Sequence, residues 1–526
     1  TSVPQNLGKP LGRRWSRYSK LLRSSPMKHK ICFVVFAVVF LSVFVSAQTV
    51  TETSYIKARE VLDKSIGAYG GGANLRSIQS FTLKAVGDTV QRNQSRKTFA
   101  FDRTPYQIDI VADLKGNRFS QIVQGGYPGG FRYHSGFAVD KTDGMSYDLI
   151  RKVTVARPNI QPAAMRQRLR YIPQMIIINA LDRASRLRSL GKTDFLGRPH
   201  NVISYSNEDA LEIALYFDGV TNLLTKFETL GTDSFFGDVI TEVTFSGYKN
   251  EGGHPIAVGR TTKVAREMVE DLRYEQLAFN TNPGDDLFKA PVEMPAMRPA
   301  PANADPVTKL SENVYTVLAG GYNVLFVGFK DFIFVMEAPG NDNVSRQAIE
   351  AIKKTIPGKP IKYISVTHHH DDHAGGLRRY VAEGATVIAA PGEKTFFEKV
   401  VKGQFTVDPD ALMLNPQPLK IEILEGGKRV LSDGTNIVEI HDIGSGPHTE
   451  EMLVAYLPNE KIIFQGDLLN RPANGDYPIA NDTSAHFAKW LESKKLAVEK
   501  IIPVHGTVTT MDELRKAVAD MQRAQK

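Results

Sequence analysis

The chain has 526 residues, of which 42% are hydrophobic, an ordinary value for a soluble globular protein and a length that predicts two folded domains. Its formal net charge of +8 at first suggests an anionic partner such as nucleic acid. All of this excess lies in residues 1–47, which contain eight lysines and arginines and no acid, so the remainder is formally neutral. We therefore expect no nucleic-acid partner.

The first 47 residues have the layout of an export signal. An apolar run from Ile31 to Val45 follows a short cationic stretch and leads to the small residue Ala47. This order predicts a signal peptide over residues 27–47 and an exported protein, periplasmic or secreted. An uncleaved membrane anchor is the alternative, but the apolar run is shorter than the roughly 20 residues of a spanning helix. Residues 1–26 are expected to be an unstructured upstream extension.

The single cysteine, Cys32, lies inside the apolar run. A mature chain that begins after Ala47 would contain no cysteine. Disulfides, thiolate metal ligands and cysteine nucleophiles are therefore all excluded from it.

Residues 48–290 predict an α+β domain built mainly on an antiparallel sheet. Helical spacing of apolar residues runs over 54–69 and stops at three glycines. Residues 210–230 predict two strands around a turn at Asp218, and residues 239–264 predict a second pair. The role of this domain stays open, and capture of a lipid or glycan is one possibility.

A proline- and alanine-rich stretch over residues 291–306 offers no periodic apolar face and predicts a linker. Downstream, in residues 307–526, short apolar runs alternate with helical stretches. This alternation predicts a layered α/β domain.

The run VTHHHDDHAGG, residues 366–376, directly follows a strand-like apolar run and precedes a predicted helix. Residues two apart on extended backbone point the same way, so His368 and His370 can face one point. Asp372 and His373 lie where the chain turns into the helix and can face a second point. The pattern therefore predicts ligands for two adjacent metal ions.

Three further candidate ligands each follow an apolar run. His448 lies in a glycine-rich loop, and Asp467 and His505 come directly after strand-like segments. Loops at one edge of a sheet converge, so we expect these side chains to join the first four. The three further histidines of this domain, His369, His441 and His486, are expected to be structural, and Asp371 is expected not to be a ligand.

These residues carry a resemblance to the metallo-β-lactamase superfamily over residues 307–526. The resemblance implies a four-layer αβ/βα sandwich with the site at the edge shared by its two sheets. It implies that the first metal is held by His368, His370 and His448, the second by Asp372, His373 and His505, and that Asp467 bridges both.

One departure from the family pattern is visible at Glu337. The early family motif usually ends its strand with an aspartate and a glycine, whereas this strand runs FVMEAPG. That position supports the site and is not a ligand, so metal binding is still expected.

Five imidazoles and two carboxylates without a thiolate suit two zinc ions, with iron or manganese as alternatives. Two such ions roughly 3.5–4 Å apart can share a hydroxide, because each lowers the pKa of bound water. We expect Asp372 to be catalytic, orienting this hydroxide and passing its proton to the leaving group.

The function predicted from these residues is an exported dinuclear zinc hydrolase that cleaves an ester, lactone or amide of a small molecule. Asp467 stands where true β-lactamases usually have a cysteine or serine, so a β-lactamase is an alternative only. A mononuclear iron sulfur-dioxygenase and a ligand-binding protein with a secondary metal domain are the others. A membrane is expected to be a partner only through an uncleaved signal segment. Pocket walls are expected at residues 393–405 and 470–478, which could equally be ordinary core.

Overall fold

Residues 54–526 form one compact unit. The predicted signal peptide and residues 297–304 of the predicted linker lie outside the described residues, so the predicted domain boundaries stay predictions. In the described part of the chain, no helix has both the length and the apolar character needed to cross a membrane. The computed structural model describes residues 48–141, 143–156, 165, 167–207, 211–296, 305–471 and 478–524.

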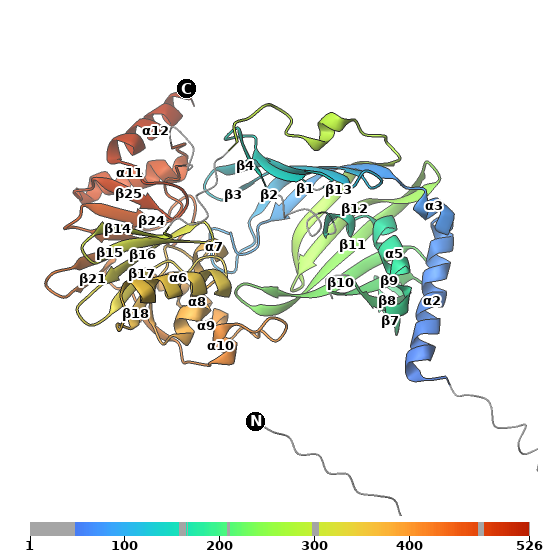
Figure 1. Cartoon of the computed structure of the whole chain (residues 1–526), viewed down its shortest axis with the longest axis horizontal. Coiled ribbons are helices and arrows are strands. Elements are labelled where there is room, and N and C mark those ends of the chain that lie inside the picture. The colour runs from blue at the N-terminus through green and yellow to red at the C-terminus, as the bar shows by residue number, and fades with distance from the viewer. Residues whose placement is uncertain are drawn as a thin grey trace, which may run out of the picture. The chain divides into compact units, whose positions relative to one another are not determined.

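A 13-stranded antiparallel sheet dominates the first half of residues 54–526 (Figure 1). It consists of two meanders, β1 to β6 and β7 to β13, which meet where β1 pairs with β13. The mainly antiparallel sheet predicted from the sequence is thus confirmed. Its strands are β1 (Ser80–Val90), β2 (Arg103–Asp113), β3 (Arg118–Tyr127), β4 (Phe131–Asp140), β5 (Asp143–Asp148), β6 (Val153–Ala156), β7 (Arg188–Phe195), β8 (Arg198–Ser206), β9 (Glu212–Asp218), β10 (Leu224–Asp233), β11 (Gly237–Glu251), β12 (His254–Val264) and β13 (Glu267–Phe279).

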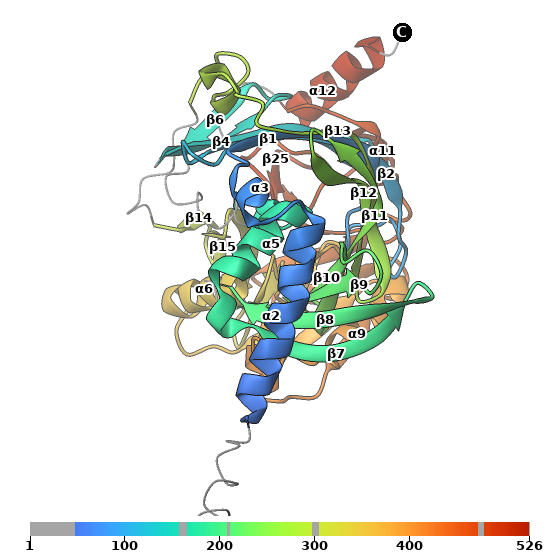
Figure 2. The same cartoon turned by 90° about the vertical axis from the view of Figure 1, so that its right-hand side faces the viewer.

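One face of this sheet is covered by α2 (Val50–Ala68) and α5 (Pro173–Asp182), with the short α3 (Gly72–Arg76) beside them (Figure 2). Leu62 and Ile66 of α2 are buried in the same core as strand residues such as Phe81, because helical spacing places them on one side. The sequence predicted this helix and both hairpins, which are β9 with β10 and β11 with β12.

The second half contains two smaller sheets. Strands β14 to β17 are antiparallel, and β17 to β20 are parallel. In the other sheet only β24 and β25 pair in parallel. The strands are β14 (Val307–Ser311), β15 (Val314–Ala319), β16 (Tyr322–Gly328), β17 (Ile333–Met336), β18 (Ile361–Ser365), β19 (Thr386–Ala389), β20 (Lys420–Ile423), β21 (Lys428–Ser432), β22 (Ile437–Asp442), β23 (Leu453–Leu457), β24 (Ile462–Gln465) and β25 (Lys500–Pro503).

These sheets face each other, with helices on both outer sides (Figure 1). Strand β23 shows why: Leu453 and Ala455 enter the core between the sheets, whereas Val454 and Tyr456 enter the core beneath α11 and α12. The predicted four-layer αβ/βα sandwich is confirmed. Its helices are α6 (Asp342–Thr355), α7 (Asp371–Ala374), α8 (Leu377–Ala382), α9 (Lys394–Val400), α10 (Ala411–Leu414), α11 (Asp482–Lys494) and α12 (Met511–Ala524).

The turn between β10 and β11 of the large sheet packs into the sandwich. Phe235 is fully buried in the apolar core beneath α6, α8 and α9, and its ring centroid lies 5.0 Å from that of Phe396. Beside it, the backbone N–H of Asp238 donates to Gln404 O over 2.6 Å, and its carboxylate accepts from Thr406 N. The large sheet is therefore anchored to the sandwich by both apolar burial and hydrogen bonds.

Replacing Phe235 with alanine tests this anchor. The loss of a buried phenylalanine typically costs about 3–5 kcal/mol, so we expect a clear fall in melting temperature by calorimetry. The control is Leu230→Ala, because Leu230 lies on the same hairpin but its side chain is 44% exposed. Equal melting temperatures for the two variants would contradict the anchoring role.

Candidate metal centre

The candidate ligands lie where several strands of the sandwich end. His368 and His370 follow β18, His448 lies in the loop between β22 and β23, Asp467 follows β24 and His505 follows β25. Each strand is fixed by its buried apolar residues, so the loop after it emerges at a defined place. Sequence positions more than 130 residues apart thereby meet at one edge.

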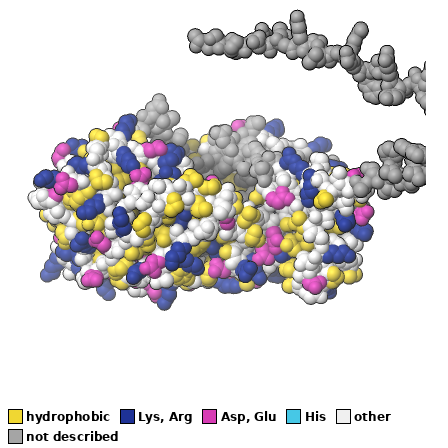
Figure 3. Space-filling view, turned by 90° about the horizontal axis from the view of Figure 1, so that it is seen from below, with side chains coloured by type: hydrophobic (Ala, Val, Ile, Leu, Met, Phe, Trp, Pro, Cys, Tyr) yellow, Lys and Arg dark blue, Asp and Glu magenta, His cyan; other side chains and the backbone are white. Residues whose placement is uncertain are grey.

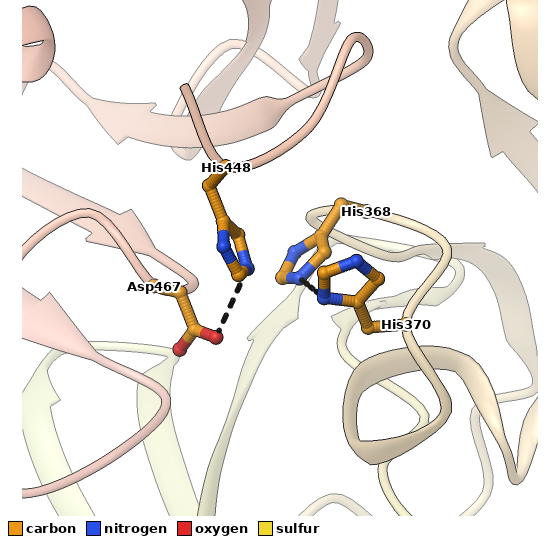
Figure 4. A group of neighbouring side chains, drawn as sticks. All are labelled: His368, His370, His448 and Asp467. Atoms are coloured by element: carbon orange, nitrogen blue, oxygen red, sulfur yellow. Dashed lines mark hydrogen bonds and ion pairs between the residues drawn. The ribbon is translucent and has the colours of Figure 1, made fainter. Parts of the chain in front are cut away.

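The first ligand group contains His368, His370, His448 and Asp467, whose ligand atoms all lie within 4.8 Å of one another. Figure 4 shows the four side chains pointing toward a common centre. His368 Nε2 lies 3.0 Å from His370 Nδ1, and Asp467 Oδ2 lies 3.3 Å from His448 Nε2. His448 Nε2 is buried and makes no hydrogen bond with any described residue. A bound cation would satisfy this nitrogen.

The second group contains Asp372, His373, Asp467 and His505, again within 4.8 Å of one another. His505 Nε2 lies 3.1 Å from Asp372 Oδ2 and 3.3 Å from Asp467 Oδ1. The side chains of His505 and Asp372 are 31% and 26% exposed, whereas that of His373 is fully buried. The centre is therefore open to solvent beside His505 and Asp372.

The structure brings together all seven residues predicted to be ligands, in two groups that share Asp467. Their role as metal ligands stays a prediction. Of the residues predicted not to be ligands, His369 and Asp371 lie outside both groups although they adjoin them in sequence. His441 also lies outside both groups, and its Nε2 lies 2.9 Å from Glu439 Oε2.

Burial shapes the protonation of the first group. It lowers the pKa of His368 and of His370 well below the usual value, because a charged imidazole is poorly solvated there. These two rings are therefore neutral at neutral pH. A neutral imidazole is the form that binds a metal ion.

Charge pairing shapes the second group. Burial acts to lower the pKa of His373, but the carboxylates of Asp372 and Asp467 outweigh it and raise that pKa well above its usual value. Burial likewise acts to raise the pKa of Asp467, but His505 and His373 hold it well below its usual value. The group thus demands positive charge between its carboxylates, which a divalent cation supplies more effectively than a proton.

Glu337 is a buried carboxylate beside His373 of the second group. Its Oε1 accepts a hydrogen bond from Thr367 N over 2.8 Å, and its Oε2 lies 3.3 Å from His373 Nδ1. The carboxyl is fully buried and lies outside both ligand groups. With this carboxylate beside Nδ1, His373 Nε2 faces Asp467 and Asp372. The departure from the family motif at this position therefore preserves the site.

The predicted pocket walls lie in different surroundings. Phe396 and Phe397 of residues 393–405 belong to the apolar core, although Phe396 also borders a cavity of about 420 Å³ next to His369. Residues 472–477 of the second predicted wall lie outside the described residues.

Four groups near the ligands that had not been predicted come from the loops and strands of the large antiparallel sheet. They are the side chains of Gln94 and Phe131 and the backbone carbonyls of Ser95 and Pro128. Nothing in their local sequence indicates a metal site.

The sandwich matches a known protein family. Residues 339–505 match the family model described as the metallo-beta-lactamase superfamily. This range contains all seven candidate ligands, ending at His505. No curated protein matches the chain.

Similar solved structures include the DIM-1 metallo-beta-lactamase, which is 22% identical over 41% of this chain and 96% of its own, with a TM-score of 0.31. FIM-1 from Pseudomonas aeruginosa, in its mono-zinc form, is 22% identical over 42% of this chain and 96% of its own, with a TM-score of 0.31. The sec-alkylsulfatase Pisa1 from Pseudomonas sp. is 18% identical over 42% of this chain and 41% of its own, with a TM-score of 0.32. At these identities and scores, the likenesses bear on neither substrate nor mechanism.

Glu337→Gln tests the supporting carboxylate. It keeps the side chain's shape but removes the charge beside His373, so we expect zinc affinity to fall by about 10- to 100-fold. Affinity is measured by competition with a chromophoric chelator. The matched control is Glu393→Gln, because Glu393 is equally buried and lies 3.9 Å from His369 Nδ1, outside both groups. Unchanged affinity in Glu337→Gln would remove Glu337 from the centre.

Proposed function

We propose that this chain, whose residues 339–505 form a metallo-beta-lactamase superfamily domain, is an exported dinuclear zinc hydrolase. The family match and the ligand set support the coarser assignment of a metal-dependent hydrolase. The finer proposal rests on Asp467, which belongs to both ligand groups. Its Oδ2 faces His448 and its Oδ1 faces His505, so one carboxylate can serve two neighbouring cations.

Zinc suits the donor set. Imidazole nitrogen and carboxylate oxygen are both common zinc ligands, and each group offers four such donors. Bound divalent ions supply Lewis acidity and lower the pKa of water toward about 7, which makes a nucleophile available at neutral pH. Iron and manganese use the same donor types, so metal analysis is part of the test.

Asp372 is the residue we assign to proton transfer. Its Oδ2 lies beside His505 Nε2, while its Oδ1 accepts a hydrogen bond from Gln94 Nε2 over 2.8 Å. The side chain is partly exposed at the open side of the centre, where a substrate can reach it. There it can accept the proton of the attacking water and deliver it to the departing oxygen or nitrogen.

The substrate class we propose is an ester, lactone or amide of a small molecule. An aspartate at position 467 resembles the superfamily's hydrolases of thioesters, lactones and phosphodiesters rather than its true β-lactamases, which usually have cysteine or serine there. Tyr322 adds an apolar wall, with its ring centroid 5.2 Å from that of His505 and meeting it edge to face. Such a wall favours a substrate with an apolar portion.

Export and the absence of a nucleic-acid partner complete the proposal. The apolar run from Ile31 to Val45, followed by the small residue Ala47, supports export. Beyond residue 47 the sequence is formally neutral, and the face shown in Figure 3 has basic and acidic side chains interspersed. A nucleic-acid surface would require an excess of positive charge.

Metal counting together with substrate turnover tests the proposal. We expect two zinc ions per chain by mass spectrometry, and hydrolysis of at least one ester, lactone or amide in a panel that includes β-lactams, thioesters and phosphodiesters. His370→Ala should lose metal and activity, whereas His441→Ala should retain both, since His441 lies outside the ligand groups. One iron per chain would favour the dioxygenase, and a metal-loaded chain that cleaves nothing would refute a hydrolase.

Asp372→Asn tests the proton-transfer role. The amide keeps the shape of the side chain but cannot accept the proton, so we expect kcat to fall by about 10²- to 10⁴-fold. The rate is measured at saturating zinc, so that weaker binding at the second group does not account for the loss. An unchanged kcat would show that another group transfers the proton.

A further inference from the structure

Two loops of the large antiparallel sheet reach the ligands of the metal centre. One is the β1–β2 loop, residues 91–102, and the other is the β3–β4 turn, residues 128–130. We propose that these loops are positioning elements of the centre, which orient two ligand imidazoles through backbone carbonyls and one ligand carboxylate through an amide. This proposal deepens the proposed function and rests on it.

The β1–β2 loop orients His370. The carbonyl oxygen of Ser95 lies 3.0 Å from His370 Nε2, while His370 Nδ1 faces His368 Nε2. A carbonyl can only accept a hydrogen bond, so the proton of the neutral ring is held at Nε2. The lone pair at Nδ1 is then directed into the first ligand group. Ser95 O also lies 3.0 Å from His369 Nε2, so both neighbouring rings are held by one acceptor.

The β3–β4 turn orients His448 in the same way but through the opposite nitrogen. Pro128 O lies 3.0 Å from His448 Nδ1, which leaves Nε2 directed toward Asp467. The ring of Phe131 packs against the imidazole edge to face, with the centroids 4.9 Å apart. One carbonyl and one aromatic ring thus fix both the tautomer and the rotation of His448.

Gln94 acts on the second ligand group. Its Nε2 donates to Asp371 Oδ1 over 2.5 Å and to Asp372 Oδ1 over 2.8 Å. With Oδ1 of Asp372 occupied in this way, Oδ2 is left facing His505. The β1–β2 loop therefore reaches both groups, through Ser95 and through Gln94.

The β1–β2 loop is itself held in place by contacts that surround the His448 loop. The Arg96 guanidinium donates from Nε to Gly446 O over 3.0 Å and from Nη2 to Ser445 Oγ over 3.1 Å. In the reverse direction, Glu450 N donates to Arg96 O over 3.0 Å. Three hydrogen bonds therefore join the β1–β2 loop to the His448 loop, as a positioning role requires.

The ligand imidazoles take their hydrogen-bond and ion-pair partners from two parts of the chain. Thr367 Oγ1 lies 3.1 Å from His368 Nδ1, and Glu337 lies beside His373 Nδ1, so these rings have partners within the sandwich. The sheet supplies the partners of His370 and His448. By contrast, the Phe235 turn anchors the sheet through apolar core that holds no ligand.

Two adjacent glycines in the β3–β4 turn provide a matched test. Gly129 and Gly130 both have positive φ, 87° and 80°, so an added side chain is comparably strained at either position. A Cβ at Gly129 would lie 3.0 Å from His448 Cα and 2.7 Å from Thr483 Oγ1. A Cβ at Gly130 would lie no closer than 4.0 Å to its nearest neighbours. Only the first substitution pushes on the ligand loop.

The experiment measures Zn²⁺ affinity of the full chain by chelator competition, and the visible absorption spectrum of the Co²⁺-loaded chain. We expect Gly129→Ala to bind Zn²⁺ at least about tenfold more weakly, with an altered Co²⁺ spectrum. Gly130→Ala should stay within about twofold of the parent in affinity and keep its spectrum. Equal affinities and spectra for the two variants would overturn the positioning role of the turn.

A second pair of variants, in glutamines of the β1–β2 loop, tests the role of that loop. It keeps the inference testable if a glycine variant fails to fold. Gln94→Ala should weaken Zn²⁺ binding by about tenfold, whereas Gln91→Ala should not, because the Gln91 amide donates to the hydroxyl of Tyr133. Equal Zn²⁺ affinity in these two variants would overturn the role of Gln94. A parent chain that binds no Zn²⁺ would refute the proposed function as well, whereas a parent that binds it with indifferent variants would refute this inference alone.

Discussion

The carboxylate of Asp467 is the constraint on which the rest of the centre depends. It is buried and held ionised between imidazoles of two ligand groups. Burying an ionised carboxylate costs several kcal/mol of desolvation free energy unless the charge is paired. The surrounding imidazoles must therefore lie within ion-pair distance of it. Strand β24 carries it to the sheet edge, and β18 and β25 carry its partners to the same edge. The two-sheet sandwich therefore places imidazoles around the buried carboxylate and so offsets the cost of burying its charge.

The centre also has an outer layer, which comes from two different parts of the chain. Glu337 and Thr367 lie within the sandwich and face His373 and His368. Ser95 and Pro128 lie in loops of the large sheet, and their carbonyls face the other two rings of the first group. A sheet that contacts the ligands in this way cannot be regarded only as a separate binding module. Its position bears on the geometry of the ligand set.

Features that depend on neighbouring residues in the sequence could be predicted, whereas contacts between distant parts of the folded chain could not. The seven ligand candidates could be predicted because each is an ionisable side chain that follows an apolar run, such as His505 after β25. Two hairpins of the large sheet, β9 with β10 and β11 with β12, could be predicted from alternation and turn residues. The carbonyls of Ser95 and Pro128 could not, because every residue has a carbonyl and only the tertiary fold selects which one meets an imidazole. Gln94 is 277 residues from Asp371, and no local pattern links them.

The central claim is that Asp467 is shared by two metal ions, and anomalous X-ray diffraction at the zinc edge tests it most directly. Crystals of the zinc-loaded chain should show two anomalous peaks about 3.5–4 Å apart on either side of Asp467. One peak should lie among His368, His370 and His448, and the other among Asp372, His373 and His505. A single peak, or two peaks of which neither contacts Asp467, would contradict the claim.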